Sequence, residues 1–289
     1  MINIKRVFLV FLSFVICFEL ILRMFGFCNA PLYYASPKYE YMTLPNQNGK
    51  RFGNSYYFNE FSQRSGSPSK KKKRILGIGD SVINGGVPTD QDSLATTILS
   101  ETTNFQWLNI SAGSWGPDNI AAYLSDFGTF EAEKMILVCS SHDSHDNMDF
   151  SPVVGVHPSY PNNQYSLAIL ELFERYLLPR IFGGEGYKGN ENVIKNGLTF
   201  NSGFDSLLKI ASRHRVDLVI YLHPEQSEIE MGKYHVQGVE IVEWAEKHNI
   251  KIIKGLDNGF SQNDFRDNIH LNEKGQRKLA VVLKERLNL

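Results

Sequence analysis

The chain has 289 residues, of which 42% are hydrophobic, and its formal net charge at pH 7 is -1. This length is sufficient for one sizeable core with a terminal extension, and the nearly neutral charge gives no general attraction to nucleic acid. The three cysteines, at positions 17, 28 and 139, form no disulfide framework.

The first predicted element is an apolar helix near the N-terminus. Lys5 and Arg6 precede the apolar run 7–18, and Glu19 and Arg23 follow at a spacing that lets them pair on a helix. We expect an uncleaved, single-pass signal anchor over 1–28, with the body on the extracytoplasmic (periplasmic) side of the cytoplasmic membrane. A cleaved signal peptide is the second interpretation, and a buried core helix is the third.

Residues 29–73 are rich in Tyr, Asn, Ser, Gly and Lys without a sustained period, which predicts an extended connector lying over the body. Short apolar segments then alternate with helical patterns. Strands are predicted at 74–79, 106–111, 134–141, 216–222 and 250–255, and helices at 92–103, 117–130, 165–181, 203–214, 235–248 and 272–287. This alternation predicts an α/β domain over 74–289, with a five-stranded parallel sheet covered on both faces. An insertion at about 144–202, with a glycine cluster at 183–186, is a candidate lid or substrate-recognition element.

A serine stands directly after the first strand of this domain. Gly79-Asp80-Ser81 ends the strand at the sheet edge where ligands bind in such folds. Near the C-terminus, Asp267 and His270 lie in the loop before the last predicted helix. The aspartate can hold one ring nitrogen of the histidine while the other takes a proton from the serine. Taken separately, each motif is also compatible with an ordinary turn.

Together, these motifs resemble the SGNH, or GDSL-type, family of serine hydrolases over about 74–289. Gly79-Asp80-Ser81 resembles the nucleophile block, and Asp267-Asn-Ile-His270 resembles the acid–base block. Segments 19–23 and 59–64 resemble the anchor and the lead-in of membrane-anchored bacterial members. The resemblance implies a flavodoxin-like three-layer α/β/α fold, a catalytic triad of Ser81, Asp267 and His270, and no cofactor.

The oxyanion hole implied by the resemblance includes one departure from the family. Segment 109–117 resembles the glycine block, so the N–H groups of Ser81 and Gly116 would donate to the oxyanion. The family's third block supplies an asparagine side chain, but His142 occupies that position here. An imidazole can donate the same hydrogen bond, and Asn147 is a weaker substitute.

Several other polar or aromatic side chains are candidates for binding. A metal could be held by His142, Asp143, His145 and Asp146, but ligands from one irregular loop have poor geometry, so we expect no metal. Candidate substrate contacts, with packing or rim polarity as the alternative, are Trp115, Asp143 and His223.

We therefore expect a membrane-anchored serine esterase acting on O-acyl esters, O-acetyl in particular, of a cell-envelope or extracellular carbohydrate. One alternative is an O-acyltransferase, in which a sugar hydroxyl replaces water and the same triad serves. Another is a non-catalytic carbohydrate-binding or assembly protein with a degenerate site, motivated by the missing asparagine. A nucleotide binder is disfavoured because the first loop lacks a Gly-x-Gly-x-x-Gly pattern.

Overall fold

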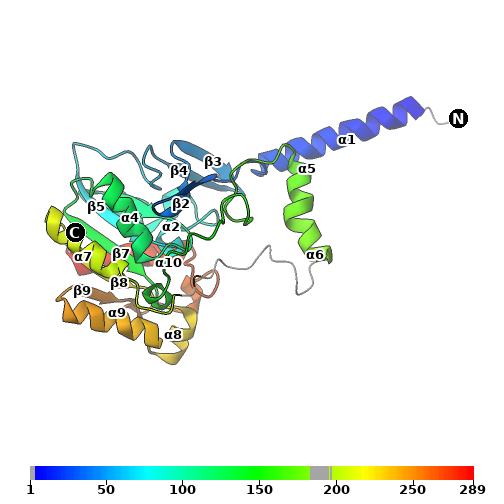
Figure 1. Cartoon of the computed structure of the whole chain (residues 1–289). Coiled ribbons are helices and arrows are strands. Elements are labelled where there is room, and N and C mark those ends of the chain that lie inside the picture. Colours follow the sequence, from blue (N-terminus) through cyan, green and yellow to red (C-terminus); the bar gives the residue numbers. More distant parts are fainter. Residues whose placement is uncertain (1–3, 183–194, 196) are drawn as a thin grey trace.

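The computed structural model describes residues 4–182, 195 and 197–289. Its centre is a parallel sheet in the order β6-β5-β7-β8-β9, formed by β5 (Lys73–Gly79), β6 (Phe105–Ser111), β7 (Lys134–Cys139), β8 (Asp217–Leu222) and β9 (Lys251–Lys254) (Figure 1). The five predicted strands are therefore confirmed, with small differences at their ends. The chain reverses its direction of winding at β5, so the crevice at the carboxyl ends of β5 and β7 is where such sheets bind ligands.

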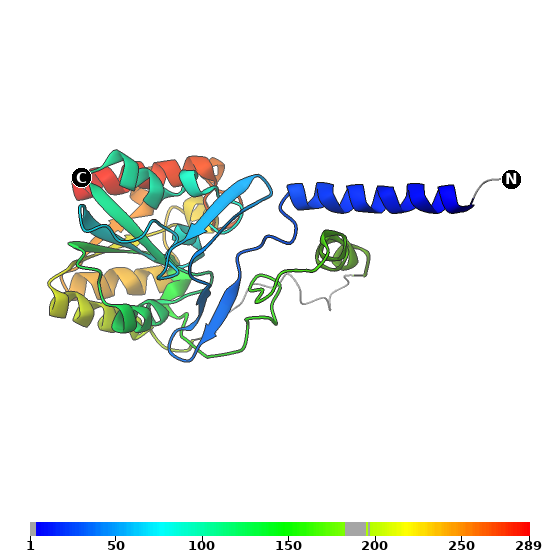
Figure 2. The ribbon, with the colours of Figure 1, turned by 90° about the horizontal axis from the view of Figure 1, so that it is seen from above.

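Helices cover both faces of the sheet, which confirms the three-layer α/β/α prediction (Figure 2). Leu76 and Ile78 of β5 face the core beneath α4 (Pro117–Phe127), α7 (Gly203–His214) and α9 (Val236–Lys247). Ile75, on the other face, packs with α3 (Ala95–Thr102) and α10 (Glu273–Leu287). Because side chains alternate along each strand, a continuous apolar run supplies both cores.

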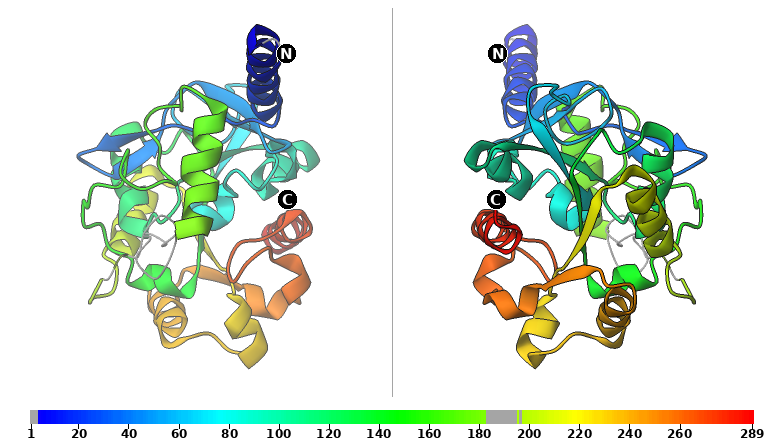
Figure 3. Two further views of the ribbon diagram at one scale, coloured as in Figure 1. Left: turned by 90° about the vertical axis from the view of Figure 1, so that its right-hand side faces the viewer. Right: turned by 90° about the vertical axis from the view of Figure 1, so that its left-hand side faces the viewer.

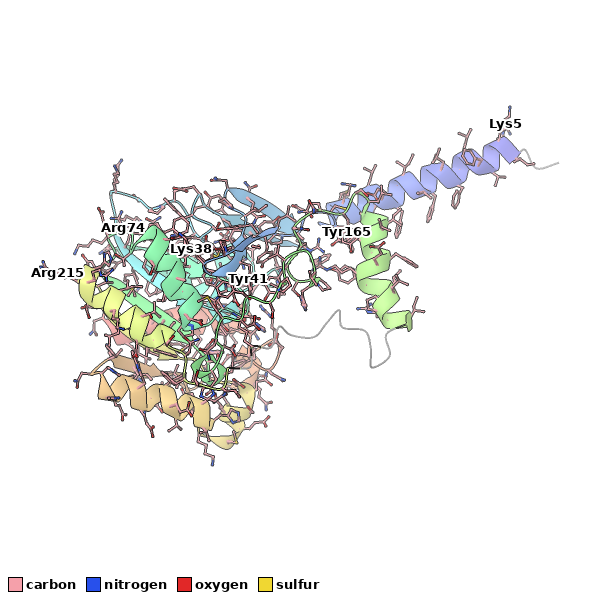
Figure 4. The ribbon with its side chains drawn as sticks, viewed as in Figure 1. Lys5, Lys38, Tyr41, Arg74, Tyr165 and Arg215 are labelled. Carbon is pink, nitrogen blue, oxygen red and sulfur yellow. The ribbon has the colours of Figure 1, made fainter. Side chains whose placement is uncertain are left out.

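The segment 29–73 differs from the predicted extended connector, because it folds into two antiparallel hairpins on the body. One pairs β1 (Tyr33–Ser36) with β2 (Glu40–Thr43), and the other pairs β3 (Gln47–Arg51) with β4 (Asn54–Phe58). Tyr41, labelled in Figure 4, and Met42 enter the core beneath α4. These strands have four or five residues of mixed polarity, so they produce no clear periodic signal in the sequence.

The N-terminal helix α1 (Ile4–Met24) projects away from the body (Figures 1 and 2). Its 21 residues, at about 1.5 Å per residue, match the thickness of a bilayer core. Only 6% of its most apolar 18-residue stretch is buried, which rules out a core helix. Arg23 Nε donates to Glu19 Oε1 at 2.7 Å, as the spacing predicts. By length and composition, α1 is a candidate membrane span or signal sequence.

A helical run also forms in the insertion, where one is predicted at 165–181. It consists of α5 (Ala168–Glu171), a π-helical turn (Leu172–Leu177) and α6 (Leu178–Phe182). The wider turn precedes Pro179, whose missing N–H disfavours regular α-helical bonding there. The predicted glycine cluster 183–186 lies outside the described residues. The other short helices are α2 (Ser81–Asn84) and α8 (Gln226–Met231).

Candidate active site

The end of β5 presents Ser81 at the carboxyl edge of the sheet. A Cβ at Gly79 would overlap the carbonyl oxygen of Val138 on β7, so only glycine permits the neighbouring strand to pack so closely. Asp80 Oδ1 accepts a hydrogen bond from the N–H of Val82 at 2.8 Å and thereby caps α2. Ser81 is therefore the first residue of a short helix that begins directly after the strand.

The structure brings together the three residues of the predicted triad, although Ser81 and His270 are 189 residues apart in the sequence. Ser81 Oγ lies 2.9 Å from His270 Nε2, and His270 Nδ1 lies 2.8 Å from Asp267 Oδ2. Asp267 Oδ1 also accepts hydrogen bonds from the backbone N–H groups of Ile269 and His270. Partial burial opposes ionisation of Asp267, but these bonds hold its pKa well below the usual range. The carboxylate thus favours the Nδ1–H tautomer of His270, which leaves Nε2 to accept a hydrogen bond from Ser81 Oγ.

His223 supports the triad loop from beneath, which corrects its prediction as a substrate contact. Its side chain is fully buried and packs against Phe265, and its Nε2–H donates to the carbonyl of Ile269 at 2.8 Å. Burial lowers the pKa of His223 to about 4, so the ring is neutral. The residue holds the backbone next to His270 and does not face the crevice.

Two arginines hold the turn that follows Ser81. Arg64, which is buried, donates to three carbonyl groups of the turn 84–89 at 2.6 to 2.7 Å. Burial lowers its pKa to about 10, so it remains charged at neutral pH. Arg266, beside the triad aspartate, donates to the carbonyl of Gly85 at 3.0 Å. The only sequence signal for this support is the likeness of 59–64 to a family lead-in.

Gly116 is not available as an oxyanion donor, which corrects that prediction. Its N–H donates to Asn119 Oδ1 at 2.9 Å, because Gly116 caps the start of α4. Ser114, two residues earlier, has a φ of 57°, in the left-handed region that favours glycine. Within the described residues, the N–H groups of Ser81 and Ser114 donate to no other atom. Both N–H groups are therefore free to donate to a bound group.

The loops that carry these two donors leave the sheet side by side. Gly79, at the end of β5, is the register partner of Ser111, at the end of β6. The residues that follow, 80–81 and 112–114, are therefore neighbours at the carboxyl edge. No sequence signal marks Ser114, because a serine with positive φ is indistinguishable from any other serine in the sequence.

His142 lies after β7 in the short turn Ser141–Ser144, surrounded by carboxylates. Its Nδ1 is 3.2 Å from Glu225 Oε1, and its Nε2 is 3.7 Å from Asp146 Oδ2 and 4.0 Å from Asp80 Oδ2. Burial favours the neutral ring, but Asp143 and the other carboxylates raise the pKa of His142 to about 10. The ring is therefore an imidazolium at neutral pH, with a proton on each nitrogen to donate.

Three further predictions fail because the side chains are committed elsewhere. Trp115 is buried and its indole N–H donates to the carbonyl of Tyr41 at 2.9 Å, so it packs in the core. Asp143 is also buried, and its Oδ2 accepts from the N–H of Ser140. Asn147 Nδ2 donates to backbone carbonyls within the insertion. None of these three side chains is placed to contact a substrate or an oxyanion.

The four candidate metal ligands do not converge on one point. His145 Nε2 pairs instead with Glu240 Oε2 at 2.6 Å. Ligand atoms of Asp80, His142 and Asp143 lie within 4.8 Å of one another. Asp80 and Asp143 are buried, which raises the pKa of both carboxyl groups, and both groups in turn raise the pKa of His142.

Fold and site together define an α/β protein with a serine–histidine–aspartate triad at the carboxyl edge of its sheet. No protein-family model and no curated protein matches the sequence. Among solved structures, the chain is similar to a lipolytic protein of the G-D-S-L family from Veillonella parvula, with 15% identity, a TM-score of 0.46, and coverage of 75% of this chain and 98% of that one. It is also similar to a carbohydrate acetylesterase family member from Sinorhizobium meliloti, with 12% identity, a TM-score of 0.42, and coverage of 75% and 97%. At these identities and TM-scores the likeness carries no inference about activity, which has to come from the side chains.

Proposed function

We propose that the protein is a serine esterase that hydrolyses O-acyl esters. The observation that carries this proposal is the unbroken chain of contacts from Ser81 Oγ to His270 Nε2, at 2.9 Å, and from His270 Nδ1 to Asp267, at 2.8 Å. A hydroxyl is a weak nucleophile unless an oriented base removes its proton, and this arrangement supplies both the base and its orientation.

In the first half of the reaction, Ser81 Oγ attacks the acyl carbonyl while its proton passes to His270 Nε2. The N–H groups of Ser81 and Ser114 and the imidazolium of His142 stabilise the oxyanion. Collapse breaks the ester bond, and His270 returns the proton to the departing alcohol. In the second half, His270 removes a proton from water, whose oxygen attacks the carbonyl of the acyl-enzyme. The bond to Ser81 Oγ then breaks, Oγ takes the proton back from His270, and the free acid leaves.

We propose an extracytoplasmic carbohydrate ester, O-acetyl in particular, as the substrate, and α1 as a membrane anchor. This proposal divides the chain into an anchor (1–28), a connector (29–73) and a hydrolase-like domain (74–289). Its support is the length, apolar composition and exposure of α1, together with Lys5 and Arg6 on its N-terminal side. Retention of the full-length protein in the membrane pellet after a carbonate wash tests anchoring, and its release would refute it.

The esterase proposal is tested with the detergent-solubilised full chain. Ser81→Ala should abolish both p-nitrophenyl acetate hydrolysis and fluorophosphonate labelling, while Ser212→Ala, at an exposed serine of α7, should leave both unchanged. Absence of both activities in the unaltered protein would refute the proposal. A panel of acetylated sugars then identifies the substrate, and acylated product formed with a glycan acceptor would establish transfer in place of hydrolysis. Glycan binding without turnover would establish the non-catalytic alternative.

A further inference from the structure

The helical run 168–182, formed by α5, the π-helical turn and α6, presents an apolar face that none of the other described residues covers. The exposed fractions on this face are 38% for Leu170, 46% for Phe173, 37% for Leu177 and 63% for Ile181. Spacings of three and four residues place these side chains along one side of a helix. We call these four side chains the apolar row. Such a row of exposed apolar side chains is unusual on the outer side of a helix whose other side packs against protein.

The opposite side of the run is fixed to the body by polar and aromatic contacts. Glu171 is fully buried and forms an ion pair with Arg51, which is itself buried. Tyr176, five residues later in the wider π-helical turn, accepts a hydrogen bond from Arg51 Nη2 at 3.0 Å and packs edge-on against Phe27 and Phe52. The orientation of the run about its own axis is therefore set, and the apolar row points outward.

The beginning of the run is attached to the last turns of α1. Both carboxylate oxygens of Glu19 accept hydrogen bonds from the free N–H groups at the start of α5, those of Ala168 at 2.8 Å and Ile169 at 2.9 Å. Arg23 Nη2 donates to the carbonyl of Ser166 at 2.8 Å. Tyr165, labelled in Figure 4, lies at this junction. The two charged residues at the end of α1 therefore cap the second helix as well as pairing with each other.

The run lies crosswise to α1 and on the same side of the body (Figures 1 and 3). If α1 crosses a bilayer, the run lies along the membrane surface where α1 emerges. The end of α1 is also apolar and exposed at Leu20, Ile21 and Met24, so the two helices present adjoining apolar surfaces. A single kind of partner, lipid, would cover both surfaces. Arg180, exposed beside the apolar row, is suited to anionic headgroups.

We propose that residues 168–182 form an interfacial helix, with the apolar row inserted at the boundary between headgroups and acyl chains. This inference rests on the proposed anchoring by α1. A transmembrane helix alone leaves the body free to swivel, whereas a second contact crosswise to it fixes the tilt of the body against the bilayer. The triad is then held at a constant orientation to the membrane surface, which favours ester substrates close to that surface.

The test uses full-length protein in phosphatidylcholine–phosphatidylglycerol vesicles with brominated acyl chains, which quench tryptophan fluorescence on contact. Leu177→Trp reports the apolar row, Leu12→Trp reports α1, and Val239→Trp, on the exposed side of α9, is the matched control. Because the native tryptophans are present in wild type and in every variant, the wild-type emission is subtracted to give the emission of the added tryptophan. We expect quenching at Leu177→Trp by bromines near the headgroups, quenching at Leu12→Trp by bromines at the bilayer centre, and none at Val239→Trp.

The outcomes separate this inference from the anchoring on which it rests. Quenching at Leu12→Trp without quenching at Leu177→Trp would overturn the interfacial helix and leave the anchor intact. A blue-shifted but unquenched Leu177→Trp would show that protein, such as a second copy of the chain, covers the apolar row, which also overturns the proposal. Loss of quenching at both positions would refute anchoring itself.

Discussion

Replacing Asp267 by Asn tests whether the carboxylate sets the tautomer of His270 or merely attracts its positive charge. Attraction between unit charges 2.8 Å apart is about 1.5 kcal/mol at a dielectric constant of roughly 80, which is near tenfold in rate. The high dielectric constant applies because the Asp267 side chain is 49% exposed. Charge alone therefore predicts a modest loss.

The tautomer argument predicts a far larger loss from the same substitution. Oδ1 of the new asparagine would keep its bonds to the N–H groups of Ile269 and His270, so its NH₂ group would face Nδ1. That contact requires an unprotonated Nδ1, moves the ring proton to Nε2, and removes the acceptor for the Ser81 proton. Such a change costs roughly 10⁴-fold in serine proteases.

We therefore expect Asp267→Asn to lower kcat for p-nitrophenyl acetate by about 10³- to 10⁴-fold, with KM little changed. Asp257→Asn, at an exposed carboxylate outside the triad loop, is the control and should match wild type. A kcat above one tenth of the wild-type value in Asp267→Asn would refute the tautomer role.

Substitutions at two further histidines, His142 and His223, test their roles. We expect His142→Leu to lower kcat by about 10²- to 10³-fold, because it removes the oxyanion donor. His142→Asn, which supplies an amide donor, should retain more activity. Equal kcat in His142→Leu and wild type would exclude the donor role. Since the charge on His142 is lost as the pH rises through about 10, wild-type kcat should fall there and that of His142→Asn should not. For His223, the folded pKa of about 4 lies below the unfolded value of about 6.5, so its stabilising contribution is complete above pH 6.5 and is lost as the pH falls toward 4. His223→Gln should flatten that part of a plot of Tm against pH, and an unchanged slope would contradict the buried neutral ring.

The triad residues could be predicted from the sequence because each lies directly beside a strand or a helix that the local sequence pattern indicates. Ser81 ends a strong apolar strand, and Asp267 and His270 stand three residues apart before a well-marked helix. A parallel α/β sheet gathers the segments that follow its strands at one edge, so the topology predicts that Ser81 and the loop of Asp267 and His270 share that edge. The fold was predictable for the same reason, since the Val-, Ile- and Leu-rich strands and the amphipathic helices have long, regular periods.

The errors concern features that depend on tertiary packing or on backbone dihedral angles. Gly116 fits the glycine block, but its N–H is used by Asn119, three residues later. Trp115 directly follows Ser114 and His223 directly follows the end of β8, yet their side chains point into the core. Neither burial nor a positive φ at Ser114 has a signature in a single sequence, so these roles emerged only from the structure.

The loop 112–115, which carries the proposed oxyanion donor Ser114, is held in place by contacts with the connector 29–73 and with the insertion. The hydroxyl of Tyr41, on β2, donates to the carbonyls of Gly113 and Ser114, and the backbone carbonyl of Tyr41 accepts from the Trp115 indole. Tyr160, from the insertion, donates to the same carbonyl of Gly113 at 3.0 Å. Three successive residues of the loop are therefore fixed by segments that lie between α1 and α5 in the chain. A left-handed conformation at Ser114 is costly for a residue with a side chain, and it persists only where surrounding contacts determine it. The segments that lead to the proposed membrane surface are thus the same ones that hold this loop in place.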